Sequence, residues 1–302
     1  MTSSSPVVGR PPQAVAEPAP ARDRAGGRPL SDRTFKVARR WSWATASVAL
    51  AAGTWTFLDP GLLHGPEAMQ GSARGTSLVL VTVAVPVLLV SLRRASRGSG
   101  QSALVSTGAL LYMIYNAVLL LFLTPFNAAF LVYVALLGSA SWSLGYLGAA
   151  PTVWATADRI AARAPVRAIS GYVWVVAGLN VVLWLAMIIP SLGAYPTPML
   201  EGTGVQTNAI YVQDLALWLP LSAVAALWLR RRQARGVVVV AAVLGLWVIE
   251  GISVAVDQWF GVQADPTSQV VSLTLVGPFL ALAAVGLVPL WLLLRKARSD
   301  SR

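Results

Sequence analysis

An aspartate stands inside one of the most apolar stretches of this sequence. Residues 208–232 read NAIYVQDLALWLPLSAVAALWLRRR, so Asp214 lies in a run of apolar residues that ends at three arginines. An unpaired buried charge is costly, so such a carboxylate should face other polar groups or water. Acidic residues in this position are candidates for binding a proton, a cation or a polar substrate.

A second carboxylate, Glu250, lies in the next apolar stretch. If one helix enters the membrane at about residue 209 and the next leaves it at about 256, Asp214 lies five residues and Glu250 six residues below the same surface. At about 1.5 Å of rise per residue, both lie roughly 8–9 Å deep. The two helices are consecutive and antiparallel, so we expect both carboxylates to face the interior of the bundle in one polar cluster.

Further polar residues repeat at helical spacing near these acids. Glu250, Ser253 and Asp257 fall at i, i+3 and i+7, and therefore on one helix face. Asn116 follows Tyr112 by four residues in another apolar stretch. The sequence thus predicts a substrate- or ion-binding cluster made of Asp214, Glu250, Asp257, Asn116 and Ser253.

The same residues also have a purely structural interpretation. Asp214 lies near a helix N-terminus, where the dipole favours a negative charge and where Thr207 or Asn208 could cap the helix. Glu250 could hydrogen-bond to neighbouring helices and hold them together. Both interpretations remain open at this point.

The residue types that are missing exclude several chemistries. The chain has no cysteine, and its single histidine, His64, falls in a loop between apolar stretches. No Lys lies within an apolar stretch and no P-loop pattern occurs. Haem ligation by a histidine pair within the membrane, a typical zinc site, a retinal Schiff base and P-loop ATP hydrolysis are therefore excluded. We expect no cofactor, no metal site and no catalytic residue.

The apolar stretches themselves predict an all-α, polytopic transmembrane bundle. The 302 residues are 56% hydrophobic and 12% charged, against about 25% charged in soluble domains. Each stretch is long enough to cross a hydrocarbon core as a helix, the form in which backbone amides are satisfied in lipid. We expect eight spans, at residues 41–58, 76–92, 103–123, 128–148, 169–189, 209–229, 236–256 and 270–294.

Positive charge is distributed asymmetrically along the chain. The net charge is +11, and all 23 Lys and Arg residues except Arg74 fall on one side if the N-terminus is cytoplasmic. We therefore expect the protein to lie in the cell inner (plasma) membrane. The positive-inside rule then predicts that both termini are cytoplasmic. The basic loops should contact anionic lipid headgroups in the bilayer rather than nucleic acid.

The connecting segments complete the predicted organisation. We expect a disordered basic cytoplasmic tail at 1–38, an eight-helix transmembrane domain at 39–296 and a short cytoplasmic tail at 297–302. Gly, Pro and polar residues mark outer loops at 59–75, 190–208 and 257–269, and residues 151–168 favour a short amphipathic inner helix.

Small residues and prolines predict details of helix packing. Ser141, Gly145 and Ala149 form a stripe that serves either intramolecular packing or a homodimer interface. Kinks are expected at the prolines Pro86, Pro220, Pro278 (in the pair Gly277-Pro278) and Pro289.

Between about residues 108 and 235 the chain resembles a set of multi-pass bacterial membrane proteins without assigned activity. The resemblance rests on LYMIYNAVLLL, FNAAFLVYVALLG and TNAIYVQDLALWLPL followed by RRR. It implies the helical membrane fold and brings no catalytic residue.

Three functions fit these observations. The leading hypothesis is a small transporter or permease-like protein with an outward-facing acidic pocket. A non-catalytic membrane scaffold, docking partners through its basic segments, is the alternative. A membrane enzyme acting on lipid-linked substrates, through the loop acids Asp59 and Glu67, is the weakest of the three.

Overall fold

The computed structural model describes residues 33–295, and in that range the chain folds into helices joined by loops. This confirms the all-α prediction. In chain order the helices are α1 (Arg33–Leu58), α2 (Glu67–Val79), α3 (Val85–Ser96), α4 (Gly100–Phe122), α5 (Phe130–Gly148), α6 (Pro151–Arg163), α7 (Val166–Ile188), α8 (Ala209–Gln213), α9 (Leu219–Arg230), α10 (Ala234–Ala264) and α11 (Val276–Leu294). Short π-helical turns join α2 to α3 and α8 to α9, so each of these pairs is one continuous rod.

Seven of the expected spans are long and apolar enough to cross a membrane. Within the described residues they are Glu67–Ser96, Gly100–Phe122, Phe130–Gly148, Val166–Ser191, Ala209–Arg230, Ala234–Ala264 and Leu273–Leu294. The expected span at 41–58 lies within α1, a 26-residue helix that is not among these seven. By composition, the chain is a multi-pass helical membrane protein.

Three helices extend eight or nine residues beyond their predicted spans. Helix α10 continues eight residues past the expected end at 256, so Asp257 belongs to the helix and not to a loop. Helix α2 takes in residues 67–75 of an expected loop. Helix α1 includes residues 33–38, which the sequence assigned to the N-terminal tail; the rest of that tail and the segment 297–302 lie outside the described residues. Amphipathic helix ends lack the uniform apolarity by which spans are recognised, which explains these differences.

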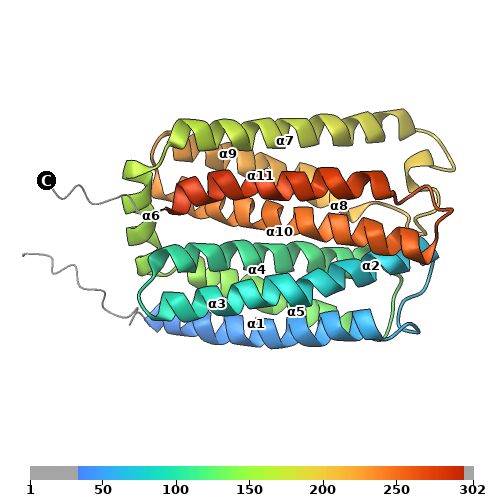
Figure 1. Ribbon diagram of the computed structural model, residues 1–302, viewed down its shortest axis with the longest axis horizontal. Coiled ribbons are helices and arrows are strands. Elements are labelled where there is room, and N and C mark those ends of the chain that lie inside the picture. Colours follow the sequence, from blue (N-terminus) through green and yellow to red (C-terminus); the bar gives the residue numbers. More distant parts are fainter. Residues whose placement is uncertain (1–32, 296–302) are drawn as a thin grey trace, which may run out of the picture.

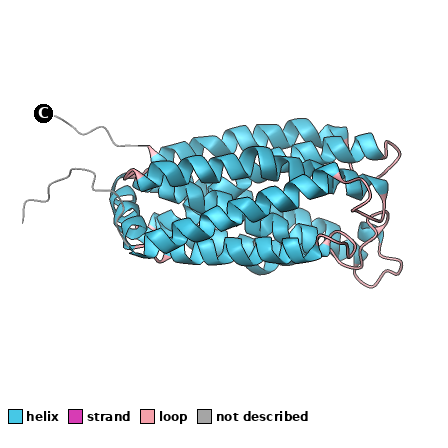
Figure 2. Ribbon diagram, turned by 90° about the horizontal axis from the view of Figure 1, so that it is seen from below, coloured by secondary structure: helices cyan, strands magenta, loops and turns pink. Residues whose placement is uncertain are grey.

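The long helices run side by side along one bundle axis, and α6 lies across one end (Figure 1). Helices α4 and α10 are the most deeply buried of the candidate spans. Helix α10 packs against α2, α4, α9 and α11. The longer loops gather at the end opposite α6 (Figure 2). Any residue on the shared α4–α10 face therefore lies in the middle of the bundle.

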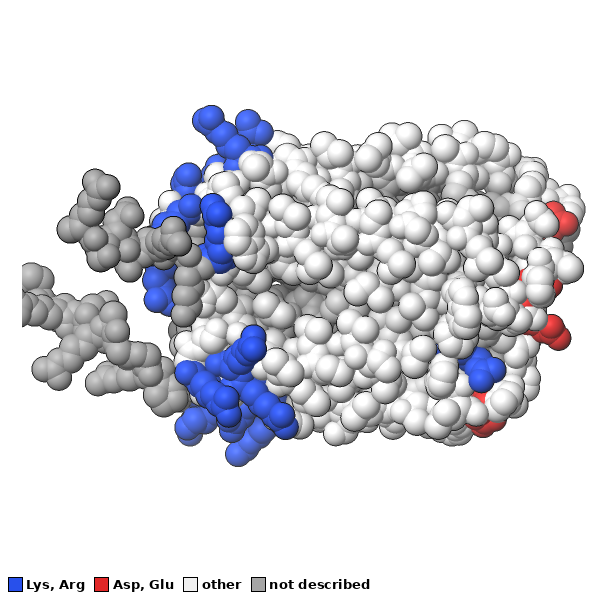
Figure 3. Space-filling view, in the orientation of Figure 1, with Lys and Arg blue, Asp and Glu red and all other residues white. Residues whose placement is uncertain are grey.

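The two ends of the bundle differ in charge. On the face drawn in Figure 3, Lys and Arg side chains gather at the end that carries α6, whereas the visible Asp and Glu side chains lie at the opposite end. The first described residue of α1 and the last of α11 also lie at the α6 end (Figure 1). We call the α6 end the basic end. Arg74 is the exception and donates from Nε to the Phe57 carbonyl, at 3.0 Å.

Glycines allow the two central helices to touch. A Cβ atom added at Gly245 of α10 would lie 2.7 Å from the Cα of Gly108 on α4. At the α2–α10 crossing, a Cβ at Gly75 would lie 2.8 Å from the Cα of Asp257. Small residues let helix backbones approach closely in lipid, where packing drives association. The approach at Gly108 fixes which polar side chains of α4 and α10 can meet.

Two pairs of hydroxyl groups link α1 to α5 in the described structure. The Thr45 and Ser143 hydroxyls are 2.9 Å apart, and those of Thr56 and Tyr133 are 2.7 Å apart. Both threonine hydroxyls also hydrogen-bond to a backbone carbonyl one turn earlier. We call these four residues the hydroxyl seam. Its members are buried, and each hydroxyl has a partner.

The prolines produce two kinds of local structure. Pro86 and Pro220 each follow a π-helical turn, Leu80–Ala84 and Asp214–Trp218 respectively. Proline has no N–H and crowds the carbonyl four residues earlier, so a widened preceding turn accommodates it. Pro289 lies inside α11, whereas Pro278 lies in the first turn of that helix, where proline is tolerated, and not in the middle of a span.

The structure also bears on two smaller predictions, the amphipathic helix and the stripe of small residues. Residues Pro151–Arg163 form helix α6, as the amphipathic pattern indicated. The stripe of Ser141, Gly145 and Ala149 is exposed on α5, and nothing described lies within 4 Å of a Cβ built at Gly145. The stripe therefore does not pack within the described bundle.

Candidate functional site

Asp214 is the first residue of the π-helical turn between α8 and α9. Its side chain is buried, with 8% of the residue exposed. The Trp184 indole of α7 donates to Oδ2 at 2.9 Å, and the Tyr115 side chain of α4 lies beside this carboxylate. The Trp184 ring packs against Tyr211, with centroids 4.8 Å apart. Three helices thus converge on Asp214, and every donor is neutral.

The start of α8 is capped as the structural interpretation proposed. The Asn208 side chain accepts a hydrogen bond from the Ile210 amide at 2.9 Å. Asp214, however, is the sixth residue counted from Ala209. The helix dipole acts mainly within the first turn, so it does not compensate the Asp214 charge.

Glu250 meets α4 through an amide. The Asn116 amide nitrogen donates to Oε2 of Glu250 at 2.8 Å and also to the Tyr112 carbonyl at 3.2 Å. Asn116 is fully buried, whereas Glu250 is partly exposed. One turn along α10, the Tyr112 hydroxyl donates to Ser253 Oγ at 3.0 Å. The predicted faces of the two helices therefore do meet.

The two carboxylates lie at matching positions along antiparallel helices. Asp214 lies 16 residues before Arg230 at the end of α9, and Glu250 lies 16 residues after Ala234 at the start of α10. The two groups are close enough to interact electrostatically. Both carboxylates bond to neighbouring helices of the bundle, and the prediction that they form one substrate- or ion-binding cluster stays a prediction. We call Asp214, Glu250, Asn116, Tyr115 and Trp184 the acidic cluster.

Asp257 lies further along α10, where that helix crosses α2. Its Oδ1 accepts from the Gln258 side chain at 3.0 Å, and its carbonyl accepts from Ser72 Oγ at 3.3 Å. Asp257 interacts electrostatically with Glu250 but shares no hydrogen bond with it in the described structure. In the described residues no three acidic or histidine side chains form a group that could hold a metal ion.

Two buried amide atoms near this region have no partner among the described residues. They are Oδ1 of Asn116 and Nε2 of Gln213, the residue before Asp214. Leaving a buried polar atom unpaired costs about 1–3 kcal/mol. Ser77 and Thr152 also have unpaired buried oxygens, elsewhere in the fold. Beside a carboxylate, an unpaired acceptor such as Asn116 Oδ1 offers a further ligand atom for a proton or a cation.

This arrangement permits a specific chemistry. No Lys or Arg of the described chain hydrogen-bonds to Asp214 or Glu250. Two ionised carboxylates at equal depth repel each other, and a proton or a cation bound between them relieves that repulsion. Neutral donors from Trp184, Tyr115 and Asn116 can orient the carboxylates in either state.

Sequence reasoning missed two members of the acidic cluster. Tyr115 lies three residues after Tyr112, so the helical spacing that singled out Tyr112 and Asn116 could have included it. Trp184 gave no comparable signal, because one aromatic residue in an apolar helix is ordinary. Of the other polar residues in the spans, Asn180 bonds to the Val176 carbonyl of its own helix, at 2.9 Å.

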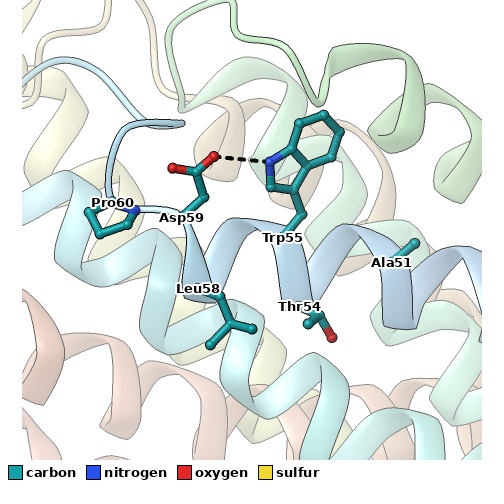
Figure 4. A pocket seen from close by; sticks show the side chains of 6 residues that line it. All are labelled: Ala51, Thr54, Trp55, Leu58, Asp59 and Pro60. Atoms are coloured by element: carbon teal, nitrogen blue, oxygen red, sulfur yellow. Dashed lines mark hydrogen bonds between the residues drawn. The ribbon is translucent and has the colours of Figure 1, made fainter.

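Two surface pockets lie away from the acidic cluster. One, of about 570 Å³, opens beside the end of α1 and is lined by Trp55, Leu58 and Asp59 among others (Figure 4). Asp59 already accepts from the Trp55 indole at 3.2 Å and from the Gly61 amide at 2.9 Å. These contacts make Asp59 part of a local turn, which weakens the enzyme hypothesis based on loop acids. A second pocket, of about 670 Å³, lies among arginines.

Comparisons with protein-family models, curated proteins and solved structures gave no match. The resemblance of residues 108–235 to bacterial membrane proteins therefore gains no family assignment. The fold and the composition identify this chain as a multi-pass helical membrane protein.

Proposed function

We propose that the protein is a small transporter or permease-like protein in which Asp214 and Glu250 exchange a proton for a cation or a cationic group of a substrate. Asn116, Ser253 and Asp257 assist by hydrogen bonding along the same face of the central helices. The single observation that carries this proposal is the carboxylate pair: two acids on adjacent antiparallel helices, with only neutral hydrogen-bond donors.

The local backbone supports the same proposal. Asp214 opens a π-helical turn ahead of Pro220, and single π turns inside α-helices occur frequently at functional sites. Interrupted helices near the middle of a membrane bundle also mark the binding sites of many transporters. A hinge at this turn gives Asp214 a way to move between the cluster and water.

Transport by proteoliposomes tests the proposal. Vesicles with an imposed pH gradient are exposed to a panel of amines, amino acids and inorganic cations, and internal pH and charge movement are recorded. We expect substrate-dependent proton movement that falls about tenfold or more in Asp214→Asn and Glu250→Gln, a loss of about 1.4 kcal/mol in the barrier. Identical behaviour of both variants and wild type at every pH would contradict the role of the carboxylates.

We infer a topology of eight spans with both termini cytoplasmic in a bacterial plasma membrane. Helix α1 runs along the full bundle beside α5 (Figure 1), which supports its role as the eighth span. The clustering of basic residues supports the orientation through the positive-inside rule. Cysteines introduced singly at Ala162 and Gly202 should react with an impermeant reagent from opposite sides.

We infer that the exposed stripe of Ser141, Gly145 and Ala149 forms a homodimer interface. Exposed small residues permit the close helix contact that stabilises membrane dimers. Replacing Gly145 with Leu should shift the protein from dimer to monomer in crosslinking and mass measurements. The matched change Gly178→Leu, on exposed α7 with open space around its Cβ, should not. Equal dimer fractions in both variants would remove the stripe from the interface.

A further inference from the structure

A pocket at the basic end is formed by two turns that are distant in sequence. Residues 165–168, at the α6–α7 turn, and residues 230–232, at the α9–α10 turn, enclose about 670 Å³. The turns meet because α7 and α9 pack side by side. The pocket lies at the bundle end where Lys and Arg gather (Figure 3).

Four arginines line this pocket, and no acidic residue does. Two of them are held in place. The Arg232 guanidinium donates to the carbonyls of Ala161 and Ala162 at 2.8 and 2.9 Å, and Arg230 lies 5.3 Å from the ring centre of Trp174. Four like charges around one hollow repel each other unless an anion neutralises them.

The other two arginines are Arg167 and Arg231, and all four arginines of the pocket are exposed. Neither guanidinium makes a hydrogen bond or an ion pair with any residue of the described chain. Each therefore retains its full set of donors in a planar fork, the geometry that recognises phosphate and carboxylate oxygens in pairs. One free guanidinium comes from each of the two turns.

The backbone around the pocket adds two features. Arg232 has a φ of 56°, in the left-handed region, and a non-glycine residue there costs about 1–2 kcal/mol. Its two hydrogen bonds to α6 hold that conformation, which presents the Arg230–Arg232 turn towards α7. Helix α7 begins beside it at Val166 without a side-chain cap, so amides of its first turn also face an anion favourably.

We propose that this pocket binds a phosphate group, and that in the membrane the group belongs to the headgroup of an anionic phospholipid. The position supports a lipid source, because the pocket lies where the transmembrane helices α7 and α9 reach the basic end. Along α7, Val175, Leu179 and Val182 are between 59% and 64% exposed at one-turn spacing. Acyl chains can lie along this apolar stripe while the phosphate contacts Arg167 and Arg231.

Lipid retention measured by native mass spectrometry tests the site. The full chain is purified from mixed phosphatidylglycerol and phosphatidylcholine, and bound lipids are counted as detergent is raised. Wild type should retain phosphatidylglycerol. The double variant Arg167→Gln/Arg231→Gln should bind it about tenfold more weakly or worse, because two charge-assisted contacts are lost.

A matched control separates a built site from general attraction to anionic lipid. Arg94→Gln/Arg97→Gln removes the same charge at the same end of the bundle, from exposed arginines outside the pocket. This variant should retain phosphatidylglycerol as wild type does. Thermal unfolding of both variants checks that they are folded. Equal lipid loss in the two variants, or no loss in either, would overturn a lipid-binding pocket.

Inorganic phosphate distinguishes the source of the phosphate group. In lipid-free detergent, added phosphate should raise the unfolding temperature of wild type more than the same ionic strength of chloride does, and should not do so for Arg167→Gln/Arg231→Gln. If phosphate alone discriminates the variants and lipid does not, the site serves a soluble phosphate. If neither ligand discriminates them, the proposal is wrong.

Discussion

The hydroxyl seam and the acidic cluster both join helices of the bundle through polar side chains. They differ in pairing: each polar group of the seam has a partner, whereas the cluster contains groups without one. In the seam, Tyr133 and Thr56 pair, and the Thr56 hydroxyl also donates to the Ala52 carbonyl at 2.8 Å. In the cluster, Glu250 and Asp214 have no basic partner among the described residues, and the side-chain oxygen of Asn116 has no hydrogen-bond partner there. Helix packing alone explains the seam. The cluster contains polar groups that helix packing does not require, and the proposed function rests on them.

The largest effect should come from separating α4 and α10. Gly245→Ala places a Cβ 2.7 Å from the Cα of Gly108, and overpacking of this kind costs about 1–3 kcal/mol. The unfolding temperature in detergent should fall and transport should fall with it. The control Gly138→Ala, with open space around its Cβ, should be neutral or stabilising by up to about 1 kcal/mol. Equal effects would mean that the crossing tolerates a side chain.

Replacing a carboxylate of the acidic cluster should abolish transport but leave the free energy of unfolding nearly unchanged. Glu250→Gln keeps an oxygen that can accept from Asn116 and removes a carboxylate that has no basic partner. Its unfolding free energy should therefore stay within about 1 kcal/mol of wild type or rise, since unpaired buried charge is costly. Transport should nevertheless be lost. A strongly destabilised Glu250→Gln would instead show that this carboxylate serves as structural glue.

The hydroxyl seam should behave in the opposite way. A double-mutant cycle with Thr56→Val and Tyr133→Phe should give a coupling of about 0.6 kcal/mol, and not more than about 1.7, as measured for such pairs in membranes. Transport per folded molecule should not change. Loss of transport in these variants would abolish the distinction between the two regions.

The smallest effect concerns a carboxylate outside the spans. Asp265, after the end of α10, accepts from the hydroxyl of Thr267 at 2.7 Å and from its amide at 3.0 Å, and these bonds lower its pKa from the ordinary 3.8. Because the pKa of Asp265 is lower in the folded protein, its bonds to Thr267 stabilise the loop fully at pH values above the ordinary pKa. This stabilisation is lost as pH falls through the pKa of the folded protein. Hydrogen exchange of the 265–272 loop should increase over that acidic window, and Thr267→Ala should show the increase at higher pH.

The sequence predicted the central features of this site for identifiable reasons. Helical spacing placed Glu250 with Ser253, and Tyr112 with Asn116, and equal depth on consecutive helices paired Asp214 with Glu250. Each prediction needed only the 3.6-residue period and the direction of the chain. The structure was needed for the partners of the carboxylates, because the rotation of α4 against α10 depends on the Gly108–Gly245 contact.

Other features could not be read from the sequence. Periodicity recognises spans by uniform apolarity, so the polar ends of α2 and α10 were assigned to loops. The arginine pocket joins turns that are more than sixty residues apart in sequence, and only the packing of α7 on α9 brings them together. Whether the stripe of Ser141, Gly145 and Ala149 faces another helix or the outside of the bundle depends on which helices pack beside α5, and the local sequence does not show this.

Infrared difference spectroscopy of the reconstituted protein tests the central claim most directly, because it records carboxyl groups as they gain and lose protons. A pH step is applied to wild type, to Asp214→Asn/Glu250→Gln and to the seam variant Thr56→Val/Tyr133→Phe. A site that exchanges protons with water predicts a reversible carboxyl band in wild type and in the seam variant that is missing from the double carboxylate variant. Superimposable spectra from all three proteins would contradict the account and leave the acidic cluster as sealed helix packing.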